Sequence, residues 1–228
     1  MNYLYANGDS WTHGDEIPDI EGYGSVSTKY YNTWPWLLSQ RLDIPVCIND
    51  AQGGAGNLRI FRRTNNFINN WIGQGRNPAD LIIVIGWTTP ERNEVASGDA
   101  VYSITVQDYL KLHRVPVDEQ LLKDYQRAFY NIYSDAYGEH MTATYMVNLR
   151  LLCKSLGIKY YDFVAIGESP HHWQEVIKTK WNIELENMYL TGAWLEEVWK
   201  YKWKTHTHMH PTIETHNLWA DVLAKELK

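Results

Sequence analysis

The chain has 228 residues, of which 44% are hydrophobic and 21% charged, enough to bury one substantial core in an ordinary globular protein. Its formal charge of -6 comes from 27 acidic and 21 basic residues without a Lys/Arg-rich run, which argues against nucleic acid as a partner. Its apolar runs are shorter than the ~18 residues of a membrane span, and its first residues lack the basic and apolar regions of a signal peptide, so we expect a protein that is cytoplasmic at synthesis. Cys47 and Cys153 match no metal or redox motif and are expected to be buried free thiols.

Three short β-type runs open the chain. Residues 3–6, 44–48 and 81–85 are rich in aliphatic and aromatic side chains, and each run ends in small and polar residues. Between them, residues 34–42 and 58–72 carry apolar side chains at helical spacing. Strands that alternate with helices predict a parallel sheet.

A fourth strand and two further helices follow. Residues 119–156 are predicted to be helical with a break near Gly138, Gly157 suits a helix C-cap, and residues 159–164 form the next strand. The last helix is expected over residues 211–227, with the proline at its first position. The pattern predicts a doubly wound α/β fold.

We expect a single domain over residues 1–228. Residues 93–118 and 165–205 do not fit the alternation and are interpreted as loop elaborations near the site. The second of them is rich in tryptophan, in a chain with 11 Trp, 16 Tyr and only 4 Phe. Aromatic rings with a polar edge suit sugar or protein surfaces, although the same rings also fill cores.

The loops after the first three strands should meet at one edge of the sheet. They contain Ser10, the glycine-rich residues 53–57, and Thr88. A serine directly after a strand can present both a nucleophilic hydroxyl and a backbone N–H, and a glycine of the second loop adds another N–H for an oxyanion hole. His210, just before the last helix, is the candidate base.

The stretch Gly-Asp-Ser-Trp-Thr-His-Gly at residues 8–14 resembles the first block of the SGNH hydrolases, also called GDSL esterases. The second block is matched by residues 49–51 with Gly54 and Asn57, and the last by His210 with the following proline. The resemblance implies a three-layer α/β/α flavodoxin-like sandwich without metal or cofactor. It also implies Ser10 as nucleophile, His210 as base, and the Ser10 and Gly54 amides as oxyanion donors.

Two positions depart from this family. Its third block reads Gly-x-Asn, whereas residues 86–88 are Gly-Trp-Thr, so Thr88 would have to supply the missing oxyanion donor. The acid that usually precedes the histidine by three residues is replaced by Thr207. Losing an orienting acid costs roughly 10⁴ in turnover, and losing one oxyanion donor roughly 10² to 10³. A main-chain carbonyl, Asp9, Asp15, Glu91 or a more distant acid could orient the imidazole.

Several of these side chains have alternative interpretations. Asp9 is expected to bond backbone amides around its turn, and Asn57 to support the site. Arg92 either binds an anionic substrate group or pairs with a nearby glutamate, Glu91 or Glu94. The alternating histidines at 206, 208 and 210 would project to one side of an extended segment, as zinc ligands can.

The sequence therefore predicts a serine ester hydrolase acting on a small ester or an acetylated glycan, as a carbohydrate O-acetylesterase does. The alternative is a catalytically degenerate SGNH-fold module that binds glycan or belongs to a larger assembly. Residues 87–92 resemble SGNH-like proteins encoded by bacteriophages, which for this alternative implies association with a virion.

Overall fold

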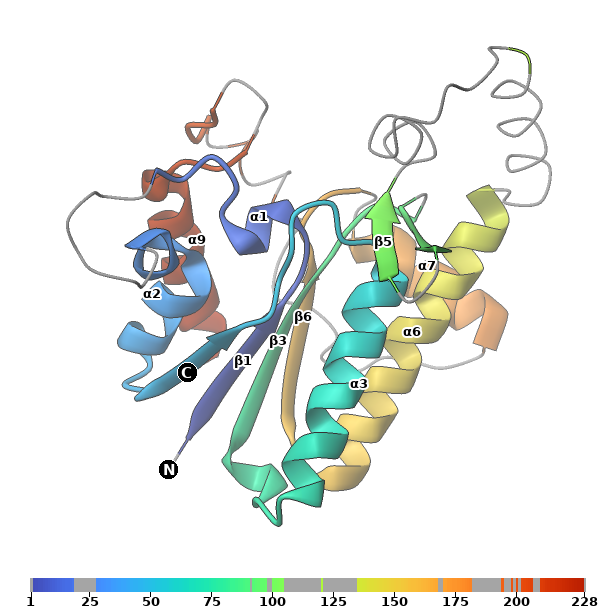
Figure 1. Ribbon diagram of the computed structural model, residues 1–228, viewed down its shortest axis with the longest axis horizontal. Helices are drawn as coiled ribbons and strands as arrows, with labels where there is room; N and C mark the ends of the chain where they lie inside the picture. Colours follow the sequence, from blue (N-terminus) through green and yellow to red (C-terminus); the bar gives the residue numbers. More distant parts are fainter. Residues whose placement is uncertain are drawn as a thin grey trace.

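The protein is described by a computed structural model over residues 2–18, 28–90, 92–97, 100–104, 120, 135–167, 170–181, 194, 198, 200, 202–206 and 210–227. Its centre is a parallel four-stranded sheet in the order β2-β1-β3-β6 (Figure 1). The strands are β1 (Tyr3–Asn7), β2 (Val46–Asn49), β3 (Leu81–Trp87) and β6 (Lys159–Val164). All three strand pairs of this sheet are parallel, as the sequence predicts.

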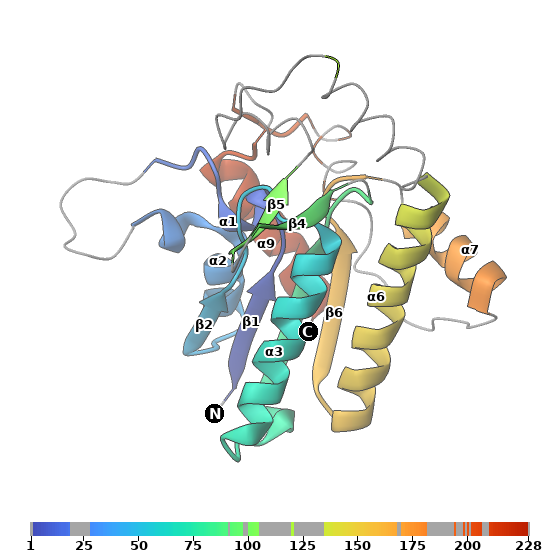
Figure 2. The same ribbon diagram turned by 45° about the vertical axis from the view of Figure 1, so that its right-hand side comes forward.

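Helices cover both faces of the sheet, which makes three layers (Figures 1 and 2). On one face lie α3 (Asn57–Gly73), α6 (Asp135–Leu156) and α7 (Pro170–Trp181), and on the other α2 (Trp34–Arg41) and α9 (Ile213–Glu226). Shorter helical turns are α1 (Ser10–His13), η1 (Thr28–Asn32) and η2 (Pro78–Asp80). The predicted α/β/α sandwich is confirmed.

The two faces of the sheet are filled by alternate residues of the central strands. Tyr5, Ile83 and Ile85 belong to the core against α3 and α6, whereas Leu4 and Val84 belong to the core against α2 and α9. Side chains of a strand point alternately to opposite faces, so a strand buried on both faces must be apolar at every position. This explains the continuous hydrophobic runs in the sequence.

Two predicted helix boundaries are wrong. Helix α6 passes from Asp135 through Gly138, because its tertiary packing on α3 and β6 outweighs the low helix propensity of one glycine, while residues 121–134 of the predicted helical stretch lie outside the described ranges. Helix α9 begins at Ile213 rather than at Pro211, since Thr212 is its N-cap and its side chain accepts the N–H of Thr215. Gly157 does adopt the left-handed conformation expected after a helix, with φ of 70°.

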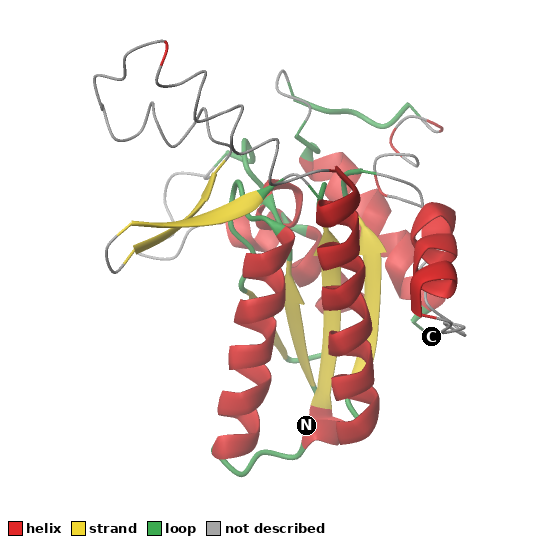
Figure 3. Cartoon of the chain, turned by 90° about the vertical axis from the view of Figure 1, so that its right-hand side faces the viewer, coloured by secondary structure: helices red, strands yellow, loops and turns green. Residues whose placement is uncertain are grey.

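The stretches interpreted as loop elaborations contain regular structure. Residues 93–118 include an antiparallel hairpin of β4 (Asn93–Ser97) and β5 (Ala100–Ile104), which projects beyond the end of α3 (Figure 3). Residues 165–205 include α7, while residues 182–193 and most of 195–201 lie outside the described ranges.

Among the described helices, none combines the length and apolar character that crossing a membrane requires.

Candidate active site

Ser10 stands directly after the carboxyl end of β1, at the first position of α1. Asp9 is the N-cap of this short helix, and its Oδ1 accepts the Trp11 N–H at 3.0 Å. The turn needs glycine at position 8, because a Cβ there would lie 2.3 Å from the Thr12 hydroxyl oxygen and 3.0 Å from the Gly86 carbonyl oxygen. The turn therefore packs tightly between its own helix and the end of β3.

The loop after β2 is bonded to this turn. Asn49 Nδ2 donates to the Thr12 carbonyl at 3.0 Å, and the Gln52 N–H donates to the Gly8 carbonyl at 3.2 Å. Gly54 has a left-handed φ of 73° and is exposed. In the described part of the chain, the amides of Ser10 and Gly54 donate no hydrogen bond to another protein group. Neither N–H group is therefore committed to another group in this part of the protein.

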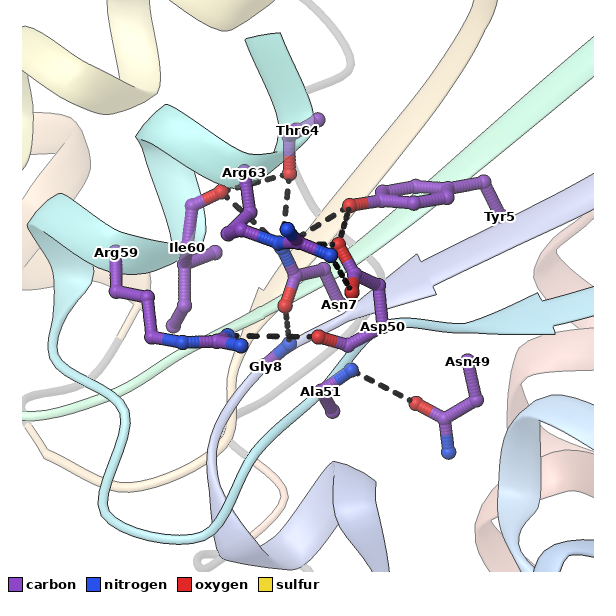
Figure 4. Close-up of polar contacts among 10 residues, drawn as sticks. All are labelled: Tyr5, Asn7, Gly8, Asn49, Asp50, Ala51, Arg59, Ile60, Arg63 and Thr64. Carbon is purple, nitrogen blue, oxygen red and sulfur yellow. Dashed lines mark hydrogen bonds and ion pairs between the residues drawn. The ribbon is translucent and has the colours of Figure 1, made fainter. Parts of the chain in front are cut away.

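A polar network beneath these loops holds them in place (Figure 4). The Gly8 N–H donates to Asn7 Oδ1 at 2.8 Å, and Asn7 Nδ2 reaches Thr64 of α3 at 3.2 Å. Asp50, directly after β2, accepts the Tyr5 hydroxyl at 2.9 Å and pairs with Arg63 through Nε at 3.0 Å and Nη2 at 2.5 Å. Burial raises the pKa of Tyr5, so its hydroxyl remains a donor. Both loops are thus fixed to α3.

Thr88 follows β3 but is directed toward Asp9. Its hydroxyl donates to Asp9 Oδ2 at 2.8 Å, and the residue is 1% exposed. Because a hydroxyl carries one proton, this bond leaves Thr88 without a donor for an oxyanion. Asn57 holds the Thr88 backbone from both sides, since its Oδ1 accepts the Thr88 N–H at 2.9 Å and its Nδ2 donates to the Thr88 carbonyl at 2.9 Å.

Arg92 also pairs with Asp9, with 3.1 Å between Nη1 and Oδ2. The pairing of Arg92 with Glu91 or Glu94 stays a prediction, because Glu91 and the side chain of Glu94 lie outside the described residues. Complete burial raises the pKa of Asp9, an effect opposed by Arg92, by the Thr88 hydroxyl, by the Trp11 N–H and by the charge of His210.

His210 lies where the chain doubles back before α9. Thr205 and Pro211 form an antiparallel bridge, and the His206 N–H donates to the His210 carbonyl at 2.7 Å. Residues 206 and 210 therefore lie opposite each other and do not follow one another along a single extended segment, which the alternative of a zinc site required. His208 and Thr207 lie outside the described residues.

The imidazole of His210 contacts an acid that the sequence interpretation did not name. Its Nδ1 lies 3.1 Å from Oε2 of Glu16, six residues after Ser10. A neighbouring pair, His13 Nδ1 and Asp15 Oδ1, is 2.5 Å apart. No sequence signal distinguishes which of the two consecutive acids reaches His210, since 194 residues separate Glu16 from it. Because Glu16 lies just after α1, this contact joins the segment before α9 to the turn that follows β1.

Solved structures of low sequence identity share this fold. TesA matches with a TM-score of 0.55 and 12% identity, over 100% of this chain and 98% of that one. The psychrotrophic esterase EstA from Pseudoalteromonas sp. matches with a TM-score of 0.52 and 12% identity, over 100% and 97% of the two chains. The three-layer α/β/α fold is therefore shared with these solved structures, one of which is named as an esterase.

No curated protein matches the sequence. Residues 15–226, most of the chain, match the profile of a family described as a family of unknown function, DUF6071. The chain belongs to this family of unknown function.

Proposed function

We propose that the protein is a serine ester hydrolase in which Ser10 is the nucleophile and His210 the base. The observation that carries the proposal is the position of the histidine beside the nucleophile turn. Its Nδ1 lies 3.1 Å from Oε2 of Glu16, which follows Ser10 by six residues. With Nδ1 engaged by a carboxylate, Nε2 is the nitrogen that remains for proton transfer.

The chemistry follows from these groups. Ser10 Oγ attacks the acyl carbon while His210 Nε2 takes its proton, and the carbonyl oxygen becomes an oxyanion. The oxyanion collapses with transfer of the proton to the leaving alkoxide, which departs as an alcohol. Water, deprotonated by the same nitrogen, then attacks the acyl-serine, and the proton passes from the imidazole to the leaving Ser10 Oγ as the carboxylic acid is released. In the described part of the chain, the Ser10 hydroxyl makes no hydrogen bond, and such contacts often tighten only when substrate binds.

We assign the oxyanion to the amides of Ser10 and Gly54. Thr88 would join them only by giving up its bond to Asp9, so its first role is to fix the carboxylate beneath the nucleophile. A hole with two donors instead of three lowers turnover by roughly 10² to 10³. The proposal therefore implies a slow esterase, or one whose substrate supplies further contacts.

An acetylated glycan remains the proposed substrate class beyond simple esters, but the described tryptophans add little to it. Trp173 and Trp194, from the Trp-rich stretch, are buried at 1% and 0% exposure and pack in the two cores. Exposed aromatic surface occurs instead at Tyr31, which is 42% exposed and packs edge-on against Trp36. Acetate release from acetylated xylan, beside hydrolysis of p-nitrophenyl acetate, tests the substrate class separately from the catalytic residues.

The catalytic proposal is tested by intact-mass labelling with a fluorophosphonate probe. We expect one adduct on the wild type, none on Ser10→Ala, and none on His210→Ala within the time in which the wild type is fully labelled. His13→Ala is the matched control, because this histidine also contacts a carboxylate and lies three residues from Ser10, yet has no role in the proposal. Loss of the adduct in His13→Ala but not in His210→Ala would reassign the base, and an unlabelled wild type would contradict an activated serine.

A second candidate function is a binding or structural module on the SGNH fold, including a component of a virion. It is favoured by one observation, the commitment of the Thr88 hydroxyl to Asp9 where the family has an oxyanion donor. This function predicts no adduct and no turnover, together with glycan or partner binding that Ser10→Ala leaves unchanged.

A further inference from the structure

We infer that Glu16 is the positioning residue of His210, so that the nucleophile and the acid come from one turn. The inference rests on the proposed function. It assigns the orienting role to a residue that follows Ser10 in sequence, far from the histidine that it holds. The contact between His210 Nδ1 and Glu16 Oε2, at 3.1 Å, is its basis.

The backbone after α1 is shaped to return this side chain to the site. Gly14 ends the helix in the left-handed region with φ of 81°, and its N–H and that of Asp15 both donate to the Ser10 carbonyl, at 2.9 and 3.0 Å. Glu16 itself has φ of 65°, a conformation that non-glycine residues rarely adopt. The Ile17 N–H then closes a turn onto the Gly14 carbonyl at 3.2 Å, and its side chain is 5% exposed.

Strained backbone in a non-glycine residue persists where surrounding contacts impose it, and such residues cluster at functional sites. Here the contacts are the two bonds to the Ser10 carbonyl and the buried Ile17. They hold Glu16 in place relative to the nucleophile itself. The side chains of Glu16 and His210 are 27% and 21% exposed, so the pair is partly shielded from water.

The other described acids near the site have different partners. Asp15 contacts His13. Its Oδ2 also packs so closely against Gly53 that a Cβ on this glycine would lie only 2.3 Å from it. Asp9 accepts from Thr88 and pairs with Arg92. Of these three carboxylates, Glu16 is the one whose hydrogen bond reaches His210.

A carboxylate on Nδ1 has two effects on an imidazole base. It holds the proton on Nδ1, which keeps Nε2 bare and able to accept the serine proton, and it stabilises the imidazolium that forms when the serine attacks. Glutamine in place of glutamate keeps the size of the side chain but removes the charge. It can also donate its amide N–H to Nδ1 and so favour the unproductive tautomer.

The first experiment measures the rate of fluorophosphonate labelling in Glu16→Gln, Glu16→Asp and the matched control Asp15→Asn. We expect labelling of Glu16→Gln to fall by roughly 10² to 10⁴, as when the acid of a serine triad loses its charge. Glu16→Asp should recover part of the rate, because it restores a carboxylate, although at a greater distance from His210. The labelling rate of Asp15→Asn should stay within about threefold of the wild-type rate. A Glu16→Gln rate within the same threefold range would overturn the inference.

A double-variant cycle separates positioning from a general structural effect. His210→Ala should label only slowly, over long incubation at high probe concentration, and if Glu16 acts through the imidazole, Glu16→Gln should not slow this residual labelling further. An equal loss in both backgrounds would show that Glu16 only maintains the turn and would refute the assignment. If labelling of the wild type requires His210 but proceeds equally well without the Glu16 carboxylate, this inference is rejected and the proposed function remains intact.

A tautomer measurement tests the contact without relying on activity. In ¹⁵N-histidine-labelled protein, neutral His210 should be the Nδ1-protonated tautomer in the wild type and should lose this preference in Glu16→Gln. An Nε2-protonated imidazole in the wild type would contradict the inference whether or not the probe reacts.

Discussion

Asn57 is the residue whose removal should most disturb the candidate site without touching the proposed nucleophile or base. It is 2% exposed and joins three elements: α3 from which it comes, Thr88 after β3, and Thr142 of α6. Its side chain makes three hydrogen bonds, at 2.9 Å to the Thr88 N–H, 2.9 Å to the Thr88 carbonyl and 3.0 Å to the Thr142 hydroxyl. The variant Asn57→Ala removes all three.

The expected cost follows from the groups left behind. Thr88 and Thr142 are each 1% exposed. The Thr88 N–H, the Thr88 carbonyl and the Thr142 hydroxyl would therefore lose a hydrogen-bond partner while buried. A buried polar group without a partner costs about 1 to 3 kcal/mol. A water molecule or a rotated hydroxyl can satisfy part of this loss. We therefore expect a decrease of about 3 to 5 kcal/mol in the free energy of unfolding, within the range that a buried network supports.

Urea denaturation followed by tryptophan fluorescence measures this difference. The matched control is Asn69→Ala, an exposed asparagine on the same helix, which should change stability by less than about 1 kcal/mol. Freeing the Thr88 backbone should also slow fluorophosphonate labelling, because the Thr88 hydroxyl would no longer hold Asp9. An Asn57→Ala variant as stable as the control would refute the view that this side chain fixes the end of β3.

Three further outcomes are expected. Asp9→Asn should lower stability by about 1 to 3 kcal/mol in thermal or urea unfolding, because an amide N–H would then face the Thr88 hydroxyl and Arg92, which both donate to the carboxylate. An unchanged midpoint would contradict this. Removing Asp162, which is 1% exposed and pairs with Arg150, should cost about 3 to 5 kcal/mol, since it leaves a cation without its buried partner; a loss below about 1 kcal/mol would show that the pair is dispensable. Burial raises the pKa of the Cys47 thiol from 9.0 to about 11 and that of Cys153 to about 12, so both should react with Ellman's reagent at pH 8 only after unfolding. As the pH rises, the thiols ionise in the unfolded state before they ionise in the folded state. The stabilisation that their burial provides should therefore be present below pH 9 and lost as the pH rises toward 11.

The sheet could be predicted because its signals are local. The apolar runs at residues 3–6 and 81–85 and the helical spacing at 58–72 depend only on neighbours in sequence, and the observed elements agree within two residues. The carboxyl-edge rule for parallel sheets then placed Ser10 and the second loop together. Helix ends were harder to predict, because the cap of α9 is decided by a side-chain bond of Thr212 and not by the proline before it.

The sequence by itself determined the α/β class, the alternation that fills the two cores, and the turn that presents Ser10. The tertiary structure alone decided which charged and polar groups meet. It joins Thr88 and Arg92 to Asp9, and it brings Glu16 to a histidine 194 residues away. The physical reason is that periodicity and turn chemistry act over a few neighbouring residues, whereas the partner of a carboxylate depends on which distant segments the fold packs together.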